Sequence, residues 1–416
     1  MALLVAIPAS VLWNRLAINT APYRAQINSF ILRRKKMKAK RIIMFSLVFA
    51  LAGFAFAGGA QSGSKADKKL VIGFNNYLQG NYSLDILEKS FKATCDALGV
   101  EPYVLNDEAK PENSASNVDN MINAGVDGIV FFGINDTLFP VVARKCTDAK
   151  IPFVFFDHMP SDETLARVVS SPYYKGIAAT VDYGTGANIA NYALQRGLKK
   201  AVVVTGQQGD TTHTARTNGF TDTFTKGGGQ VLAQAYGPVD LSGALTRAND
   251  TLTAHPDADC IYATNGDVGT SCIEALSKHP AMKASIFVTD LDPSVLDGLK
   301  TGKVAAGNGA HWVNVDFATA LLVNALRGNT ITDGGKAPRL VVPVMTLPSN
   351  LVELYDRYWI QQQPFSADEM RSWVGPNVAI DTYKKTLDDY NIQNRLQAKV
   401  SQGLLKQADL DAALKQ

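Results

Sequence analysis

The sequence predicts an α/β protein with two doubly wound, parallel-sheet lobes. Three observations lead to this fold class. Short, continuous apolar runs recur along the chain, which is typical of strands buried on both faces of a parallel sheet. Amphipathic helical segments alternate with these runs, as repeated strand–helix units require. The alternation also breaks and restarts near the middle of a 416-residue chain that is 46% hydrophobic, which is enough for two cores.

The first set of alternating elements begins at Lys69. Its expected strands cover residues 69–75, 101–106, 126–133 and 151–157, and the expected helices between them cover residues 83–98, 112–125 and 137–149. The helix over 112–125 ends at a glycine, the residue most favoured at helix C-termini. We therefore expect one open sheet with helices on both faces.

The second set follows a break near Val168–Tyr174, where we place the crossover between the lobes. A long helix is expected first, over Ile177–Gln195. Expected strands then cover 201–206, 230–236, 259–265, 285–290 and 303–307, with helices from about Thr212, over 241–254, over 268–278 and just before 303. A helix over 314–328 and a strand over 339–347 complete the architecture, and a polar tail begins at about Pro348.

The beginning of the chain has the composition of an export signal. Residues 1–57 contain nine of the 41 basic residues and no Asp or Glu. From Met37, a basic segment precedes an apolar run over 42–56 and small residues at Ala55 and Ala57. This order predicts a signal peptide over 37–57, cleaved near Ala57, and a periplasmic location. The run is shorter than the ~18 residues of a membrane span, a signal anchor is the alternative, and residues 1–36 are interpreted as an upstream extension.

The rest of the chain is mildly acidic and contains all four cysteines. With 32 basic and 38 acidic residues, its net charge is −6, which argues against nucleic acid as a partner because phosphate neutralisation needs a basic face. The spacing of Cys95, Cys146, Cys260 and Cys272 matches no zinc pattern. A disulfide between Cys260 and Cys272 is one alternative, and buried free thiols are the interpretation we favour.

Polar and aromatic residues follow the expected strands in both sets. Ligands of open α/β sheets bind outside the carboxyl ends of the strands, so two such edges that face each other would form one polar cleft. The candidate ligand-binding residues at these edges are Asn76, Tyr82, Asp157, His158, Arg216, Asn265, Asp290, His311 and Trp312. Carboxylates, amides, a guanidinium and aromatic rings together suit a polyhydroxylated ligand.

Several of these polar residues also have a purely structural interpretation. Asp136, Asp267 and Asp292 are interpreted as helix caps, because Asp is common at that position. His158 and His311 have no metal-ligand spacing around them, and Trp312 suits the core as well as a ligand-facing position. Asp157 directly follows four apolar residues, which makes a capping role less convincing there.

No motif for catalysis or cofactor binding accompanies these residues. The stretch "TGQQGDTTHTARTNGF", Thr205–Phe220, lacks the phosphate-binding G-x-x-x-x-G-K-[ST] pattern, and "GFNNYLQG" lacks G-x-G-x-x-G. No G-x-S-x-G elbow occurs, and no nucleophile–base pair stands out. We therefore expect no catalytic residues, no cofactor and no metal site.

Four stretches of the chain resemble a known family. They are "IPFVFFDH", "AVVVTGQQGDTTHTARTNGF" with its R-x-x-G-F pattern, "TLTAHPDADCIYATNGD" and "FVTDLDPSVLDGLKTGKVAAG". Over roughly residues 68–346, the chain is similar to type I periplasmic binding proteins, the substrate-binding components of ABC transporters for simple sugars. The resemblance implies that Asp157, Arg216, Asn265 and Asp290 bind the ligand, with Asn76 and Tyr82 as weaker matches.

The resemblance also implies a division into lobes joined by a multi-strand hinge. It predicts an N-terminal lobe over 68–171 plus about 312–337, a C-terminal lobe over 172–311 plus about 338–347, and an extension over 348–416. The chain departs from the family at His158, where an arginine is common, at His311 and Trp312, near a common glutamine, and at Gly266, where the family has an aspartate. These departures imply a changed specificity, so a polyol, an inositol, a modified sugar and a non-sugar ligand all stay open.

The function implied by the resemblance is capture of a sugar or polyol and its delivery to an ABC transporter permease. A ligand sensor that docks to a chemoreceptor or sensor kinase is the alternative, and an enzyme acting on a small sugar is a further one. A transcription repressor of the same fold is disfavoured by the predicted signal peptide and by the lack of a helix-turn-helix segment.

Overall fold

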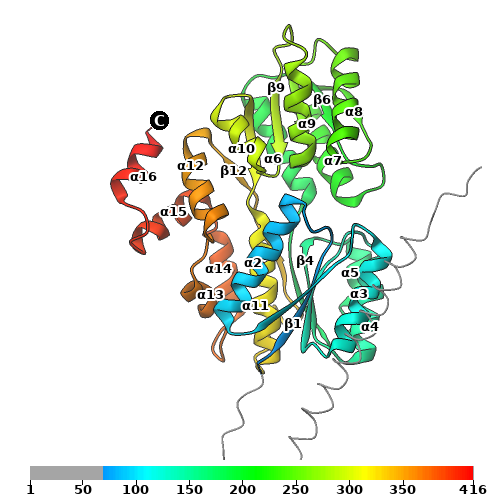
Figure 1. Ribbon diagram of the computed structural model, residues 1–416, viewed down its shortest axis with the longest axis vertical. Coiled ribbons are helices and arrows are strands. Elements are labelled where there is room, and N and C mark those ends of the chain that lie inside the picture. The colour runs from blue at the N-terminus through cyan, green and yellow to red at the C-terminus, as the bar shows by residue number, and fades with distance from the viewer. Residues whose placement is uncertain (1–68, 416) are drawn as a thin grey trace, which may run out of the picture. The chain divides into compact units, whose positions relative to one another are not determined.

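The computed structural model describes residues 69–415, and these form two sheets with helices on both faces (Figure 1). The first sheet has the order β11-β5-β4-β3-β1-β2, and every neighbouring pair is parallel. Its strands are β1 (Val71–Asn76), β2 (Glu101–Asn106), β3 (Gly128–Phe132), β4 (Phe153–His158), β5 (Tyr174–Thr180) and β11 (Arg339–Val341).

The second sheet repeats this arrangement. Its order, β12-β10-β9-β8-β6-β7, matches the first sheet strand for strand, except that β12 runs antiparallel to β10. Its strands are β6 (Lys200–Val204), β7 (Gln230–Ala235), β8 (Cys260–Ala263), β9 (Ser285–Thr289), β10 (Val304–Gly309) and β12 (Met345–Leu347). The α/β fold class with two doubly wound lobes is confirmed.

Helices cover both faces of each sheet. The first sheet is covered by α2 (Tyr82–Leu98) and α11 (Asn314–Leu326) on one face and by α3 (Pro111–Ala124), α4 (Leu138–Ala149) and α5 (Asp162–Val168) on the other. The second sheet is covered by α6 (Asp182–Gln195) and α7 (Thr211–Lys226) on one face and by α8 (Leu241–Ala254), α9 (Gly266–Ser277) and α10 (Pro293–Lys300) on the other.

The strands are apolar throughout because each buries both faces. In β6, Val202 and Val204 belong to the core under α8, α9 and α10, while Ala201 and Val203 belong to the core under α6 and α7. Successive side chains of a strand point to opposite faces, so a strand covered on both sides needs no polar residues along its length. The polar residues are therefore left to the strand ends.

The crossover between the sheets lies later in the chain than the sequence predicted. Residues 174–180 form β5 of the first sheet, so the helix predicted from Ile177 begins instead at Asp182. The predicted strand over 339–347 is two strands, and β11 pairs with β5 while β12 pairs with β10. β5 and β11 had been assigned to the C-terminal lobe, and their pairing in the first sheet corrects this, whereas the pairing of β12 agrees with its assignment. The chain passes between sheets after β5, after β10 and between β11 and β12.

The tail from Pro348 forms a series of short helices. They are η2 (Ser349–Leu351), α12 (Val352–Tyr355), the π-helical turn η3 (Asp356–Gln361), α13 (Ala367–Ser372), α14 (Ile380–Asp388), α15 (Ile392–Ser401) and α16 (Gln407–Leu414). Their buried aromatic residues join the core that contains α2 and α11. Asn324 of α11 fixes the tail by donating to the Trp373 carbonyl oxygen and the Tyr383 hydroxyl.

The remaining sequence predictions concern cysteines and export. All four cysteines are buried and free, so the favoured interpretation is confirmed and the Cys260–Cys272 disulfide is not formed. Over residues 69–415, no helix is both long and apolar enough to cross a bilayer. The predicted signal peptide over 37–57 and the upstream extension over 1–36 lie outside the described residues.

Candidate functional site

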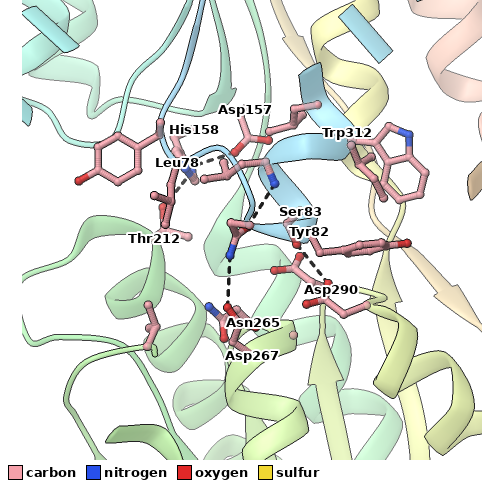
Figure 2. Close-up of a pocket in the computed structure, with 18 of the residues that line it drawn as sticks. Leu78, Tyr82, Ser83, Asp157, His158, Thr212, Asn265, Asp267, Asp290 and Trp312 are labelled. Atoms are coloured by element: carbon pink, nitrogen blue, oxygen red, sulfur yellow. Dashed lines mark hydrogen bonds and ion pairs between the residues drawn. The ribbon is translucent and has the colours of Figure 1, made fainter. Parts of the chain in front are cut away.

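A cavity of about 290 Å³ lies between the carboxyl edges of the two sheets. The first lobe lines it from the ends of β3 and β4 and the start of α2, and the second from the starts of α7, α9 and α10. Figure 2 shows Asp157 and His158 on one side and Asn265, Asp267 and Asp290 on the other. Eight candidate residues line the cavity: Tyr82, Asp157, His158, Arg216, Asn265, Asp290, His311 and Trp312.

Two aspartates occupy equivalent positions in the two lobes. Asp157 is the penultimate residue of β4 and Asp290 directly follows β9, and each of these strands is the fourth of its lobe along the chain. Both have a left-handed backbone, with φ of 75° and 74°, a conformation that Asp tolerates better than most residues. The bend turns each carboxylate out of its strand and into the cavity. Asn314 holds Asp157 by donating from Nδ2 to its Oδ1 at 2.7 Å.

Arg216 lies on α7, whose first turn is capped by Asp210. Its Nε donates to Oδ1 of Asp182 at 2.9 Å. Its Nη1 donates to the Thr264 carbonyl oxygen at 2.9 Å and lies 3.4 Å from Oδ2 of Asp290. No described residue accepts a bond from Nη2, so this end of the guanidinium is available to a ligand. Burial would raise the pKa of Asp182, but Arg216 and His158 outweigh it and lower that pKa to about 2.

His158 connects the two lobes at one end of the cavity. Its Nδ1 lies 2.9 Å from the Thr212 hydroxyl of α7 and 3.6 Å from Oδ2 of Asp182. Its Nε2 lies 3.2 Å from Oδ2 of Asp157. Burial would lower the pKa of His158, but Asp157 and Asp182 raise it above its usual value. A protonated imidazole can donate from both nitrogens at once.

Asp267 at the start of α9 and Asp290 and Asp292 just before α10 form an acidic wall of the cavity. Asn265 caps α9 by accepting from the Val268 N–H. Asp267 accepts from Asn81 Nδ2 at 3.2 Å, and Asp292 accepts from the Ser83 hydroxyl at 3.1 Å. The prediction that Asp267 and Asp292 only cap helices is wrong, because neither side chain makes a capping bond and both line the cavity. Asp136 does not cap either: its carboxylate accepts from the Ser161 N–H, just before α5, and from the Thr164 hydroxyl in the first turn of α5.

Comparison with known proteins identifies the family. Residues 72–330 match the profile described as "Periplasmic binding protein domain". The chain belongs to the periplasmic binding protein family. A ribose import binding protein of Salmonella typhimurium is 24% identical to this binding protein over 222 residues, which is 53% of this chain and 72% of that protein.

Solved structures show the same two-lobe fold as this binding protein. A galactofuranose binding protein has a TM-score of 0.63 at 15% identity, covering 71% of this chain and 99% of its own. A carbohydrate transporter from Acidothermus cellulolyticus 11B, in complex with myo-inositol, has a TM-score of 0.61 at 19% identity, covering 71% of this chain and 100% of its own. The predicted resemblance to type I periplasmic binding proteins is confirmed, and these relatives are binding proteins rather than enzymes.

One candidate residue of this binding protein does not line the cavity. Asn76 turns its Nδ2 to Oε2 of Glu88 at 2.8 Å and accepts from the Leu78 N–H at 3.0 Å. It therefore shapes the loop between β1 and α2. Asn76 is therefore not one of the residues that line the cavity, contrary to the prediction. The prediction failed because the last residue of a strand can turn along the sheet edge as well as outward.

Sequence reasoning also missed residues that build the site of this binding protein. Asp182 holds both Arg216 and His158, but it begins a helix whose start the sequence placed incorrectly. Asn81 and Ser83 reach across the cavity from the start of α2. The sequence pattern that could have pointed to them is the helix cap, since Asn81 caps α2 by accepting from the Leu84 N–H. Within residues 69–415, no group of three His, Cys, Asp or Glu side chains has the geometry to hold a metal ion.

Proposed function

We propose that this protein is an exported solute-binding protein. It captures a small polyhydroxylated ligand, a sugar or polyol, between its lobes and delivers it to the permease of an ABC transporter. The observation that carries the proposal is the cavity, in which both lobes contribute hydrogen-bonding and aromatic side chains around about 290 Å³. This volume is near the lower end of small-molecule sites, roughly 300–1,000 Å³, which suits a ligand of monosaccharide size.

The chemistry of the lining suits such a ligand. Asp157 and Asp290 can each accept from ligand hydroxyls, and Nη2 of Arg216 can donate to ring or hydroxyl oxygens. Tyr82 and Trp312 line the same cavity and can pack against the apolar face of a ring. The names of the similar proteins refer to ribose, galactofuranose and myo-inositol, which are all small polyhydroxylated molecules.

Contacts across the cavity support a mechanism of lobe closure. Asn81 and Ser83 of the first lobe meet Asp267 and Asp292 of the second, and His158 meets Thr212. We infer that the ligand stabilises these contacts by bridging the same two edges. It thereby shifts the population toward the closed form, which the permease recognises. The basic and apolar start of the chain, residues 37–57, supports export to the periplasm.

A ligand screen tests the proposal. Sugars, polyols, nucleosides and amino acids are added to the purified protein, and the melting temperature is measured, because a ligand that binds only the folded state raises it by mass action. Sugars or polyols should raise it, and calorimetry should show one site per chain. A response to amino acids or nucleosides alone would contradict the proposal.

Arg216→Ala should weaken binding of the best ligand about tenfold or more, since hydrogen bonds to charged groups contribute ~1.5–3 kcal/mol. The exposed Arg144→Ala serves as the control, and circular dichroism verifies that both variants are folded. Unchanged affinity in a folded Arg216→Ala protein would remove this side chain from the site.

A further inference from the structure

The cavity has more negative than positive charge in its lining. Five aspartates line it, namely Asp157, Asp210, Asp267, Asp290 and Asp292, together with one arginine. Two of these carboxylates have structural partners, because Asp210 caps α7 and Asp157 lies 3.2 Å from Nε2 of His158, whose pKa is raised. Arg216 is already shared between Asp182 and Asp290. The charge that remains uncompensated is therefore concentrated on Asp267, Asp290 and Asp292, the acidic wall.

The neighbours of the acidic wall neutralise it only in part. Asp267 receives a neutral amide of Asn81, and Asp292 receives the hydroxyl of Ser83. Asp290 lies 3.4 Å from Arg216, a long contact for an ion pair. Burial, followed by the charges of Asp290 and Asp267, raises the pKa of Asp292 to about 7. The three carboxylates repel one another, so a cation placed among them would be stabilised.

One buried polar atom without a partner in the described chain lies next to Trp312, behind the cavity lining. Tyr355 of α12 is fully buried, and no described residue bonds its hydroxyl. Burial raises its pKa, and so do Tyr390, Tyr82, Asp290 and Asp292, which places its hydroxyl within the field of the acidic wall. Its ring lies edge-on to Trp312, which lines the cavity, with centroids 6.0 Å apart.

Tyr82, at the start of α2, also has a buried hydroxyl without a partner among the described residues. Its ring lines the cavity, its hydroxyl is buried and bonded by no residue of the described chain, and its pKa is raised by burial and then by Asp292. A buried polar atom is almost always hydrogen-bonded in a completed site. The Tyr82 hydroxyl lacks such a partner beside the acidic wall within residues 69–415, and the rings of Tyr82 and Trp312, which line the cavity, can contact a cation through their faces.

The kind of cation follows from the geometry. Within the described residues, the carboxylates do not converge closely enough to hold a metal ion. An ammonium group carries three N–H donors, so it can donate to carboxylates that are spread along one wall. The rest of the lining, with Arg216, Asn265 and Asp157, keeps the mixed donors and acceptors that suit hydroxyl groups.

We propose that the ligand is a polyhydroxylated amine, an amino sugar or amino-polyol, whose ammonium group lies against Asp267, Asp290 and Asp292. This inference rests on the proposed function, since it specifies the ligand class of the same cavity. The acidic wall repels anionic ligands, so sugar phosphates and sugar acids should not bind.

Matched pairs of ligands test the inference. The purified protein is titrated with glucose and glucosamine, galactose and galactosamine, and myo-inositol and an amino-inositol, together with the N-acetyl derivative of each amine. We expect the amine of the best pair to bind about tenfold or more tightly than its neutral partner, as charge-assisted hydrogen bonds imply. N-acetylation, which removes the charge, should abolish this gain.

Variants of the wall separate charge from shape. Asp292→Asn should remove most of the preference for the amine, because the amide preserves the volume of the carboxylate but not its charge. The preference is measured as the ratio of the two affinities, so a loss of closure that weakens both ligands equally does not change it. Asp148→Asn, an exposed position on α4, is the matched control and should keep the full preference. A preference that survives in a folded Asp292→Asn protein would overturn the assignment of the wall.

The outcomes for the inference and for the proposed function differ. Neutral sugars that bind as tightly as their amines, or more tightly, would overturn the inference and leave the proposed function standing. No binding of any member of any pair, neutral or aminated, would instead contradict the proposed function itself.

Discussion

At the scale of single residues, the site depends on a buried charge network around Asp182. This carboxylate holds Nε of Arg216 at 2.9 Å and lies 3.6 Å from Nδ1 of His158. Both partners come from segments that line the cavity, one from each lobe. Asp182 therefore orients two candidate ligand-binding residues without lining the cavity itself.

The lowered pKa of Asp182 predicts a dependence of stability on pH. The folded-state pKa is about 2, below the usual value of 3.8. A depressed carboxyl pKa stabilises the folded state above pH 3.8, and this contribution is lost as the pH falls toward 2. It amounts to about 2 kcal/mol. Urea unfolding should thus show Asp182→Asn to be less stable than the wild type by at least that amount at pH 7, with a smaller gap at pH 3.

The same unfolding experiment shows whether Asp182 is responsible. A gap between wild type and Asp182→Asn that stays constant from pH 7 to pH 3 would contradict the account of this network. The exposed Asp148→Asn should match the wild type at every pH.

Residue-level sequence reasoning found eight of the residues that line the cavity. Asp157, Arg216 and Asp290 were predicted because they follow apolar strands, and the strand ends meet at one cavity. Asp182 was missed because β5 was taken for part of a helix. The cavity-facing position of Asp267 and Asp292 was missed because it depends on contacts with Asn81 and Ser83 of the other lobe. A local pattern has no information about such a partner.

At the scale of elements, the approach of α6 to α7 positions Arg216. A Cβ atom on Gly186 of α6 would lie 1.9 Å from the Arg216 carbonyl oxygen, and one on Gly219 of α7 would lie 1.9 Å from the Tyr183 carbonyl oxygen. The two backbones thus touch at reciprocal glycines. The helix pair is close because these positions lack side chains, and the R-x-x-G-F pattern contains one of them.

This close packing predicts opposite effects for two glycines on one helix. Gly186→Ala should destabilise the protein by more than about 2 kcal/mol, because the new methyl group meets backbone that cannot move aside cheaply. Gly184→Ala, where nothing lies within 4 Å, should be neutral or should stabilise by about 0.5–1 kcal/mol, since alanine favours the helix. Denaturant unfolding measures both, and equal losses in the two variants would contradict this packing.

Most elements were predictable from alternating apolar runs, and the failures have a common cause. β5 contains Gly176, with φ of 128°, and a register shift against β4. The segment 339–347 divides its pairing between two sheets. In both cases the strand pairs with a segment that is distant in sequence, and this pairing overrides the local secondary-structure propensity.

At the scale of the whole molecule, two sheets of the same strand order present the same edge to one cavity. This arrangement explains why equivalent aspartates, Asp157 and Asp290, have the same left-handed backbone and lie on opposite sides of the site. The tail beyond Pro348 adds Tyr355 behind Trp312. Composition and periodicity predicted that a separate tail begins near Pro348, but they did not predict this contact. The helices of the tail are short, and the core against which they pack determines which of their aromatic residues become buried.

A crystal structure with the ligand that gives the largest thermal shift tests the central claim most directly. We predict one ligand in the cavity between the lobes, within hydrogen-bonding distance of Asp157, Arg216 and Asp290. Ligand density only outside this cavity, with these three side chains making no contact to it, would contradict the account.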